Sequence, residues 1–212
     1  MKSIEKEITY QSTNSYSTLN SLTDHTRNVW FVCHGMGYLS RFFLKYFTEL
    51  NVEENYIIAP QAQSKYYMPP KFKHVGASWL TRENTLSETE NVLRYFDTVW
   101  EAESIPDDVN LIILGYSQGV SVSLRWVARR QIQCHQLVMM SGGIPKELLP
   151  VDFEFMQNVK VSHIYGIEDE YLNEERIAHE TQRSKELFRD NLEIIPFEGN
   201  HVVNVELINS LV

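Results

Sequence analysis

Short apolar runs recur along the chain and alternate with amphipathic stretches. Continuous runs rich in β-branched and aromatic residues predict strands whose two faces are both covered. These runs lie at residues 29–33, 56–59, 111–114, 136–140, 159–165 and 192–197. Two shorter, half-polar stretches at residues 4–10 and 16–19 predict edge strands at the start of a sheet.

Between the predicted strands, apolar residues recur in steps of three and four, as they do on one face of a helix. This spacing predicts helices at residues 39–50, 87–101, 117–130, 173–188 and 202–211. Ser87 and Glu90 have the spacing of a capping box at the start of the second helix. Residues 61–86 show no such period and are predicted to be irregular.

The alternation of strands and helices predicts an α/β fold, with a mostly parallel central sheet and helices on both faces. A length of 212 residues suits one domain, so we expect a single domain over residues 1–212. About 26 residues separate Pro60 from Ser87, and about 18 separate Ser141 from Val159. Neither segment is long enough for a large cap domain, so we expect an open site.

Charge and composition limit the expected partners and location. The chain has 19 basic and 28 acidic residues, which gives a formal net charge of −9. Nucleic acid and anionic membranes would repel this charge at long range, so neither is expected as the main partner. No stretch approaches 18 consecutive apolar residues, and the first residues lack the apolar region of a secretory signal. We therefore expect a cytoplasmic protein without a membrane span.

One motif carries recognisable chemistry. The sequence Gly115-Tyr116-Ser117-Gln118-Gly119 follows a predicted buried strand and opens a predicted helix. In that context G-x-S-x-G is the sequence form of a nucleophile elbow, a sharp turn that exposes a serine hydroxyl above the strand ends. The helix N-terminus also favours developing negative charge. We predict Ser117 as a nucleophile; the alternative is a glycine-rich turn with an inert serine.

A serine hydroxyl needs a base within hydrogen-bond reach, and that base needs an orienting carboxylate. With this type of elbow, the acid and then the histidine follow the serine along the chain. Four histidines do so: His135, His163, His179 and His201. Only His201 follows a predicted strand through a short turn, which places it at the same sheet edge as Ser117. We predict His201 as the base.

The orienting acid is expected in the loop after the strand at 159–165. This loop reads Gly166-Ile167-Glu168-Asp169-Glu170 and leaves the same edge of the predicted sheet. Asp169 is the first candidate. Glu168 and Glu170 are alternatives that chain order and placement do not exclude.

Two backbone N–H groups are needed to stabilise an oxyanion. One is expected from Gln118, the residue after the nucleophile. The second is expected from Met36, within the early loop His34-Gly35-Met36-Gly37, because glycines let this backbone approach a substrate. His34 is expected to be a structural hydrogen-bonding residue in this loop, without a catalytic role.

Taken together, these residues resemble the phospholipase/carboxylesterase family of the α/β-hydrolase superfamily, which includes acyl-protein thioesterases. The resemblance extends from about residue 28 to 210. Its matching pieces are His34-Gly35-Met36-Gly37, Ala59-Pro60 with Ser78-Trp79, Gly115-Tyr116-Ser117-Gln118-Gly119, Gly166-Ile167-Glu168-Asp169 and Gly199-Asn200-His201. The resemblance implies an α/β-hydrolase fold without a large cap, and the G-x-x-D match implies Asp169 as the acid.

The chain departs from the family pattern in two places. Tyr38 stands where the family often has an aspartate, and the loop between Pro60 and Trp79 lacks the usual glycine-rich stretch. This loop is expected to border the acyl site, which makes Trp79, Tyr67 and Met68 candidate substrate contacts. The alternative is that its aromatic residues pack the loop down.

The residues and the resemblance predict a carboxylesterase or thioesterase-type serine hydrolase that acts on acyl esters or thioesters. Its intermediate would be an acyl group on Ser117, and neither a metal nor an organic cofactor is expected. Two alternatives remain: a non-catalytic binding protein with the same fold, and an acyltransferase that uses the same three side chains.

Overall fold

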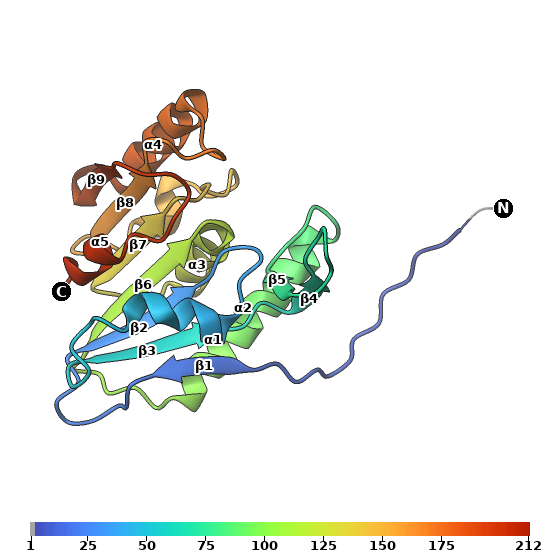
Figure 1. Ribbon diagram of the computed structural model, residues 1–212, viewed down its shortest axis with the longest axis horizontal. Coiled ribbons are helices and arrows are strands. Elements are labelled where there is room, and N and C mark those ends of the chain that lie inside the picture. Colours follow the sequence, from blue (N-terminus) through green and yellow to red (C-terminus); the bar gives the residue numbers. More distant parts are fainter. Residues whose placement is uncertain (1–2) are drawn as a thin grey trace.

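A seven-stranded sheet forms the centre of the computed structural model, which describes residues 3–212 (Figure 1). Across the sheet, β1 is antiparallel to β3 and every other neighbouring pair is parallel. The strand order is β1 (Tyr16–Leu19), β3 (Asn55–Pro60), β2 (Asn28–Cys33), β6 (Asn110–Tyr116), β7 (Gln136–Met140), β8 (Lys160–Gly166) and β9 (Leu192–Phe197). The predicted mostly parallel sheet is confirmed.

Helices cover both faces of the sheet, as predicted (Figure 1). One face packs against α2 (Thr85–Ala102), α3 (Gln118–Arg130) and α4 (Glu174–Phe188). The other packs against α1 (Ser40–Phe43), the 3-10 helix η1 (Leu44–Phe47) and α5 (Val205–Asn209). Successive side chains of a strand point to opposite faces, so Phe31 lies in the first layer and Trp30 in the second.

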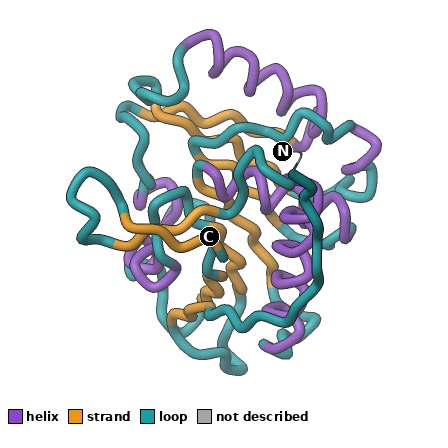
Figure 2. Tube along the Cα trace, turned by 90° about the vertical axis from the view of Figure 1, so that its right-hand side faces the viewer, coloured by secondary structure: helices purple, strands orange, loops and turns teal. Residues whose placement is uncertain are grey.

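Four local predictions differ from the structure. The segment 61–86 is not wholly irregular, because β4 (Ser64–Tyr67) and β5 (Val75–Ser78) form a hairpin that projects from the body of the molecule (Figure 2). The segment 39–50 contains two short helices, α1 and η1, rather than one. Apolar residues three apart share a face in a 3-10 helix as well as in an α-helix, so this spacing does not separate the two.

The remaining two differences concern the N-terminal segment and the start of helix α2. Residues 4–10 form no strand, and their apolar side chains are exposed. In a strand Lys6 would interrupt the face that Ile4 and Ile8 share, so this segment has no continuous apolar face to bury. Helix α2 begins at Thr85, two residues before the predicted cap, and the Ser87 hydroxyl donates to the carbonyl of Asn84 instead.

The sheet topology brings four loops to one edge. The parallel strands β2, β6, β8 and β9 all end there, and their carboxyl ends lead into the loops that begin at His34, Ser117, Ile167 and Glu198. Open α/β sheets bind ligands outside the carboxyl ends of their strands. Segments up to 167 residues apart in the sequence can therefore contribute to one site.

A buried histidine lies inside the sheet, away from that edge. His163 of β8 is 1% exposed, and its Nδ1 lies 3.0 Å from the Ser184 hydroxyl oxygen. Ser184 donates its own proton to the Thr181 carbonyl, so the Nδ1–H of His163 donates to Ser184. Burial lowers the pKa of His163 to about 4, because a charged imidazolium would lose its hydration.

This burial predicts acid sensitivity. Unfolding returns His163 to an ordinary pKa near 6.5, so the unfolded state binds a proton at a higher pH than the folded state does. The stabilising effect of the neutral ring is complete above about pH 6.5 and decreases as pH falls towards 4, by up to about 3 kcal/mol. His163→Asn retains an N–H donor near Ser184 without the titration.

We expect the free energy of unfolding to decrease less steeply in His163→Asn than in the wild type between pH 6.5 and 4, as measured by urea denaturation. His74→Asn, on the exposed hairpin, serves as the control and should retain the wild-type slope. Parallel curves for the wild type and His163→Asn would contradict this assignment.

Candidate active site

Ser117 occupies a sharp turn between β6 and α3. Its backbone has φ 53° and ψ −118°, an uncommon conformation for a residue with a side chain. Close backbone packing surrounds it: a Cβ on Gly115 would lie 2.6 Å from the Cα of Val120, and one on Gly119 would overlap the Cys33 carbonyl. Glycine is required at both positions because no side chain fits. The G-x-S-x-G segment therefore has the elbow geometry expected from the sequence.

Ser117, His201 and Asp169 form a continuous chain of hydrogen bonds. The His201 Nε2 lies 2.9 Å from the Ser117 Oγ, and the Nδ1 lies 2.7 Å from the Asp169 Oδ2. A carboxylate only accepts, so Nδ1 carries the proton and Nε2 is left to accept from the Ser117 hydroxyl. The arrangement presents a neutral imidazole to the serine, as general-base chemistry requires.

The acid loop explains why Asp169, rather than its acidic neighbours, meets the ring. Asp169 Oδ1 accepts from the N–H groups of Tyr171 at 2.9 Å and Leu172 at 3.1 Å, and the side chain is fully buried. Glu170 contacts the backbone N–H of His201 instead, at 3.2 Å. Glu168 touches the same loop only through its own N–H, which donates to Gly199. The turn thus directs one of three carboxylates inward.

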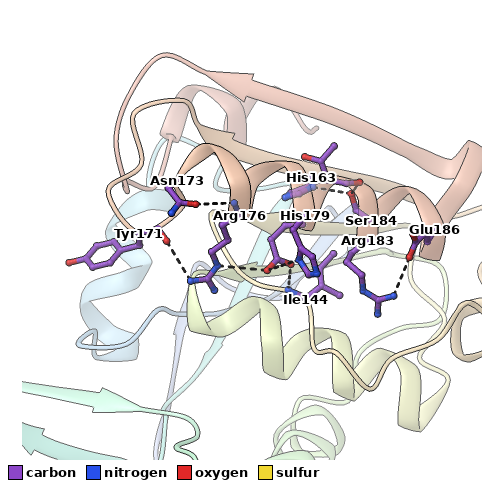
Figure 3. A network of polar contacts seen from close by, with 11 residues as sticks. Ile144, His163, Tyr171, Asn173, Arg176, His179, Arg183, Ser184 and Glu186 are labelled. Carbon is purple, nitrogen blue, oxygen red and sulfur yellow. Dashed lines mark hydrogen bonds and ion pairs between the residues drawn. The ribbon is translucent and has the colours of Figure 1, made fainter.

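Helix α4 follows the acid loop and anchors it. Asn173 caps this helix by accepting from the N–H of Arg176, and the Arg176 guanidinium also reaches the carbonyl of Tyr171 (Figure 3). Deeper along the helix, buried Glu180 accepts from the N–H of Ile144 at 2.8 Å. These contacts connect the acid loop with the loop after β7.

The other three histidines after Ser117 do not reach it. His135 accepts from the N–H of Leu111 at the opposite end of β6, and His163 is enclosed in the sheet. His179 is exposed midway along α4. His201 is the histidine that the fold brings to Ser117.

The Met36 N–H, in the loop after β2, has no protein acceptor within residues 3–212. The preceding peptide explains its direction. The Gly35 carbonyl accepts from His34 Nδ1 at 2.7 Å and from the N–H of Tyr38 at 3.3 Å. In a trans peptide the N–H points opposite to the carbonyl, so fixing the Gly35 oxygen also fixes the Met36 N–H.

His34 is buried and neutral in this arrangement. Its Nε2 accepts from the N–H of Ala62 at 3.2 Å, which leaves Nδ1 protonated to donate to Gly35. Burial lowers the pKa of His34 to about 4, although the contact with the Gly35 carbonyl acts in the opposite direction. His34 is therefore a hydrogen-bonding residue of the loop, as the sequence suggested.

The structure encloses Trp79, which the sequence predicts as a substrate contact. The residue is 1% exposed, and its Nε1–H donates to the His34 carbonyl at 2.7 Å. Its ring packs 4.8 Å from the His34 ring and 5.2 Å from that of Phe96, measured between centroids. Trp79 thus packs against the loop that contains Met36 and has almost no exposed surface. Sequence alone gave no sign that this tryptophan would be enclosed.

Tyr67 and Met68 lie on the projecting hairpin. Tyr67 is 63% exposed, whereas the end of the Met68 side chain lies 3.4 Å from where a Cβ on Gly37 would stand. Met68 is therefore next to the Met36 loop, and the aromatic residues at the tip do not pack the hairpin down. Because Met36 and Tyr171 are also exposed, with the Tyr171 ring 4.9 Å from the His201 ring, the surface around Ser117 has an apolar rim.

The site is partly exposed to solvent, because Ser117 is half-buried and the His201 side chain is 13% exposed. Two cavities among the described residues, of about 180 Å³ and 260 Å³, are not lined by Ser117, Asp169 or His201. No group of three or more His, Cys, Asp or Glu side chains in residues 3–212 is arranged to hold a metal ion. None of the helices in the described part of the chain is both long and apolar enough to cross a membrane.

One residue at the site was missed by sequence reasoning. Gly142, in the loop after β7, lies so close to the elbow that a Cβ would overlap the Ser117 carbonyl oxygen. The pair Gly142-Gly143 directly after a predicted strand was the available signal. A glycine in such a position allows close backbone approach.

No protein-family model and no curated protein matches the chain. Solved structures do. Zea mays acyl-protein thioesterase 2 matches with a TM-score of 0.70 and 13% identity, over 94% of this chain and 96% of that chain. Esterase PE8 gives 0.68 and 17% over 94% and 98%, and a phospholipase/carboxylesterase from Dyadobacter fermentans gives 0.65 and 19% over 95% and 97%.

The chain has the α/β-hydrolase fold. The alignments cover more than nine-tenths of both chains in each of these pairs, so the described residues 3–212 carry no large cap domain that these structural neighbours lack. The fold expected from the resemblance is confirmed.

The Gln118 side chain connects the hairpin with the elbow. Its Oε1 accepts from the N–H of Trp79 at 2.8 Å, and its Nε2 donates to the Leu80 carbonyl at 2.7 Å and to the Ser78 hydroxyl at 3.0 Å. An amide is needed here, because the position requires both an acceptor and a donor.

Gln118→Glu should test this connection. The carboxylate would face the Leu80 carbonyl without a proton to donate, so we expect a loss of about 1–3 kcal/mol in the free energy of unfolding at pH 7, measured by urea denaturation. Gln133→Glu, the same change at an exposed loop residue, should stay within about 0.5 kcal/mol of the wild type. Equal stability of the two variants would rule out this role for the amide.

Proposed function

We propose that this protein is a serine hydrolase that cleaves carboxylic esters or thioesters through an acyl-enzyme on Ser117. The observation that carries the proposal is the hydrogen-bond chain from the Ser117 Oγ through the His201 imidazole to the Asp169 carboxylate, at 2.9 Å and 2.7 Å. A nucleophile, a base and an orienting acid within this reach are the requirements for acyl transfer to serine.

In the first step the Ser117 Oγ attacks the substrate carbonyl, and its proton moves to the His201 Nε2. Asp169 holds the Nδ1–H and stabilises the imidazolium that forms. The imidazolium then gives the proton to the leaving alcohol or thiol as the bond between carbonyl carbon and leaving group breaks. The acyl group remains on Ser117.

Two backbone donors are available for the oxyanion. The Met36 N–H has no protein acceptor among the described residues, and the Gln118 N–H is the first of helix α3, where no preceding turn supplies one. Both follow segments whose backbone is fixed by contacts described above. In the proposed mechanism they receive the carbonyl oxygen as it gains charge, where preorganised donors act most strongly.

In the second half of the reaction, a water molecule attacks the acyl-enzyme. His201 takes its proton and returns one to the Ser117 Oγ as the acid leaves. An open site gives water direct access to this step. The three side chains complete the cycle without a metal or an organic cofactor.

The substrate class follows from the surroundings of Ser117. Met36, Met68 and Tyr171 provide apolar surface next to the nucleophile, which favours an apolar acyl or leaving group over a charged one. The structural neighbours include proteins described as an esterase, an acyl-protein thioesterase and a phospholipase/carboxylesterase. These names support ester or thioester cleavage as the reaction.

Covalent labelling tests the nucleophile directly. A fluorophosphonate probe should label the wild-type protein and leave Ser117→Ala unlabelled, because phosphonylation requires the activated hydroxyl. The outcome is measured by in-gel fluorescence and by mass spectrometry of the modified peptide. Full labelling of Ser117→Ala would end the proposal.

Turnover of p-nitrophenyl esters of increasing acyl length tests the base and the acid. We expect His201→Ala to lower kcat by several orders of magnitude, and Asp169→Asn by roughly 10⁴-fold, because the asparagine side chain favours the wrong tautomer of the imidazole. Glu170→Gln should retain most of the activity, since this carboxylate contacts only backbone. A folded wild-type protein that turns over no member of the series would favour a binding protein, and ester products formed with added alcohols would indicate acyl transfer.

A further inference from the structure

The tyrosine inside the elbow motif lies next to Ser117, the loop that contains Met36 and the His201 ring. Tyr116 is the last residue of β6 and the one before the nucleophile, and it is 2% exposed. A Cβ on Gly35 would lie 3.0 Å from its ring, so the ring fills the space that this glycine leaves open under the Met36 loop. On another side the ring lies 5.3 Å from the His201 imidazole, measured between centroids.

The phenol of Tyr116 also makes a specific bond. Its hydroxyl donates to the backbone carbonyl of His201 at 3.0 Å, across 85 residues of sequence. Burial raises the pKa of this phenol well above its usual value, so the group stays protonated and remains a donor. A buried hydrogen bond is stronger than an exposed one because water does not compete for either partner.

The other attachments of the His201 loop lie before residue 201, where the Glu168 N–H donates to the Gly199 carbonyl at 3.0 Å and Gly166 lies against Gly199 and Asn200. The loop residues from Glu198 to Val202 are exposed or half-buried, and Gly199 has φ 151°. The peptide N–H of His201 binds only the exposed Glu170 carboxylate, where solvent weakens the contact. Of the two hydrogen bonds to the His201 backbone, the one from the Tyr116 hydroxyl is therefore the less exposed.

We propose that Tyr116 is a positioning residue of the reaction. Its hydroxyl holds the His201 backbone so that the imidazole stays between Ser117 and Asp169. Its ring packs against Gly35 and so holds the loop that contains Met36 in place. This inference rests on the proposed hydrolase function. It assigns to the side chain between Gly115 and Ser117 a role that the motif alone does not give it.

Tyr116→Phe tests the role of the hydroxyl and keeps the ring. We expect kcat for a p-nitrophenyl ester to fall about 5- to 20-fold, the size of one lost buried hydrogen bond or a little more, with KM unchanged within twofold. We expect no change in KM because Tyr116 is buried and so does not contact the substrate. The rate of fluorophosphonate labelling should fall by the same factor as kcat.

A spectroscopic signature separates positioning from a general structural effect. The proton between the His201 Nδ1 and the Asp169 Oδ2 should give a downfield NMR signal in the wild type, identified by its absence in His201→Ala. In Tyr116→Phe this signal should broaden or disappear, because the loop no longer holds the ring in one place. Circular dichroism and the thermal midpoint show that the variant is folded at the assay temperature.

Tyr46→Phe is the matched control. It removes a hydroxyl from the neighbouring aromatic cluster, where Tyr46 bonds the Tyr38 hydroxyl at 3.1 Å and its ring lies 5.8 Å from that of Phe43. Among the described residues, Tyr46 makes no hydrogen bond to His201, so the variant should leave kcat and the NMR signal as in the wild type. Wild-type kcat and an intact signal in Tyr116→Phe, or an equal loss in Tyr46→Phe, would overturn the inference.

The proposed function and this inference fail in different ways. A wild-type protein without turnover or labelling removes the hydrolase proposal, while the downfield signal still reports whether Tyr116 holds His201. An active wild type with an unaffected Tyr116→Phe leaves the hydrolase proposal standing and removes only the positioning role.

Discussion

Close contact between backbone segments around Ser117 is the constraint on which the site depends. Gly119 lies against the end of β2, and Gly142 lies against the Ser117 carbonyl, with no space for a side chain at either position. Packing from both sides holds Ser117 in a backbone conformation that would otherwise be unfavourable. The same contact with β2 places the loop that carries Met36 next to Ser117, so the proposed nucleophile and the proposed oxyanion donor lie close together.

The remaining parts reach this centre from separate strands. The sheet order puts β8 and β9 at the far edge from β2, and the loops after them extend back towards β6 with Asp169 and His201. Gly166 allows these two loops to come into backbone contact, because a Cβ there would lie 2.3 Å from the Gly199 carbonyl oxygen. Burial then favours a fixed geometry, because the Asp169 carboxylate is enclosed and bonded on both oxygens.

The parts that could be predicted from the sequence are those with a local signature. Apolar runs located the central strands, the G-x-S-x-G motif selected Ser117, and chain order with placement at the sheet edge selected His201. Choosing among Glu168, Asp169 and Glu170 needed a family resemblance, since the turn that directs one inward depends on bonds from Tyr171 and Leu172. The enclosed Trp79 and the bond between Tyr116 and His201 could not be predicted, because each joins distant segments and neither has a sequence motif of its own.

At Met36, the proposed role in the reaction does not depend on which side chain the residue has. Met36 is 61% exposed, while the group proposed to receive the oxyanion is its main-chain N–H, which every residue except proline has. Substitutions at this position can therefore change which substrates are preferred and still keep the backbone N–H that is proposed to stabilise the oxyanion. Sequence comparisons that score only side-chain identity would overlook a backbone group of this kind.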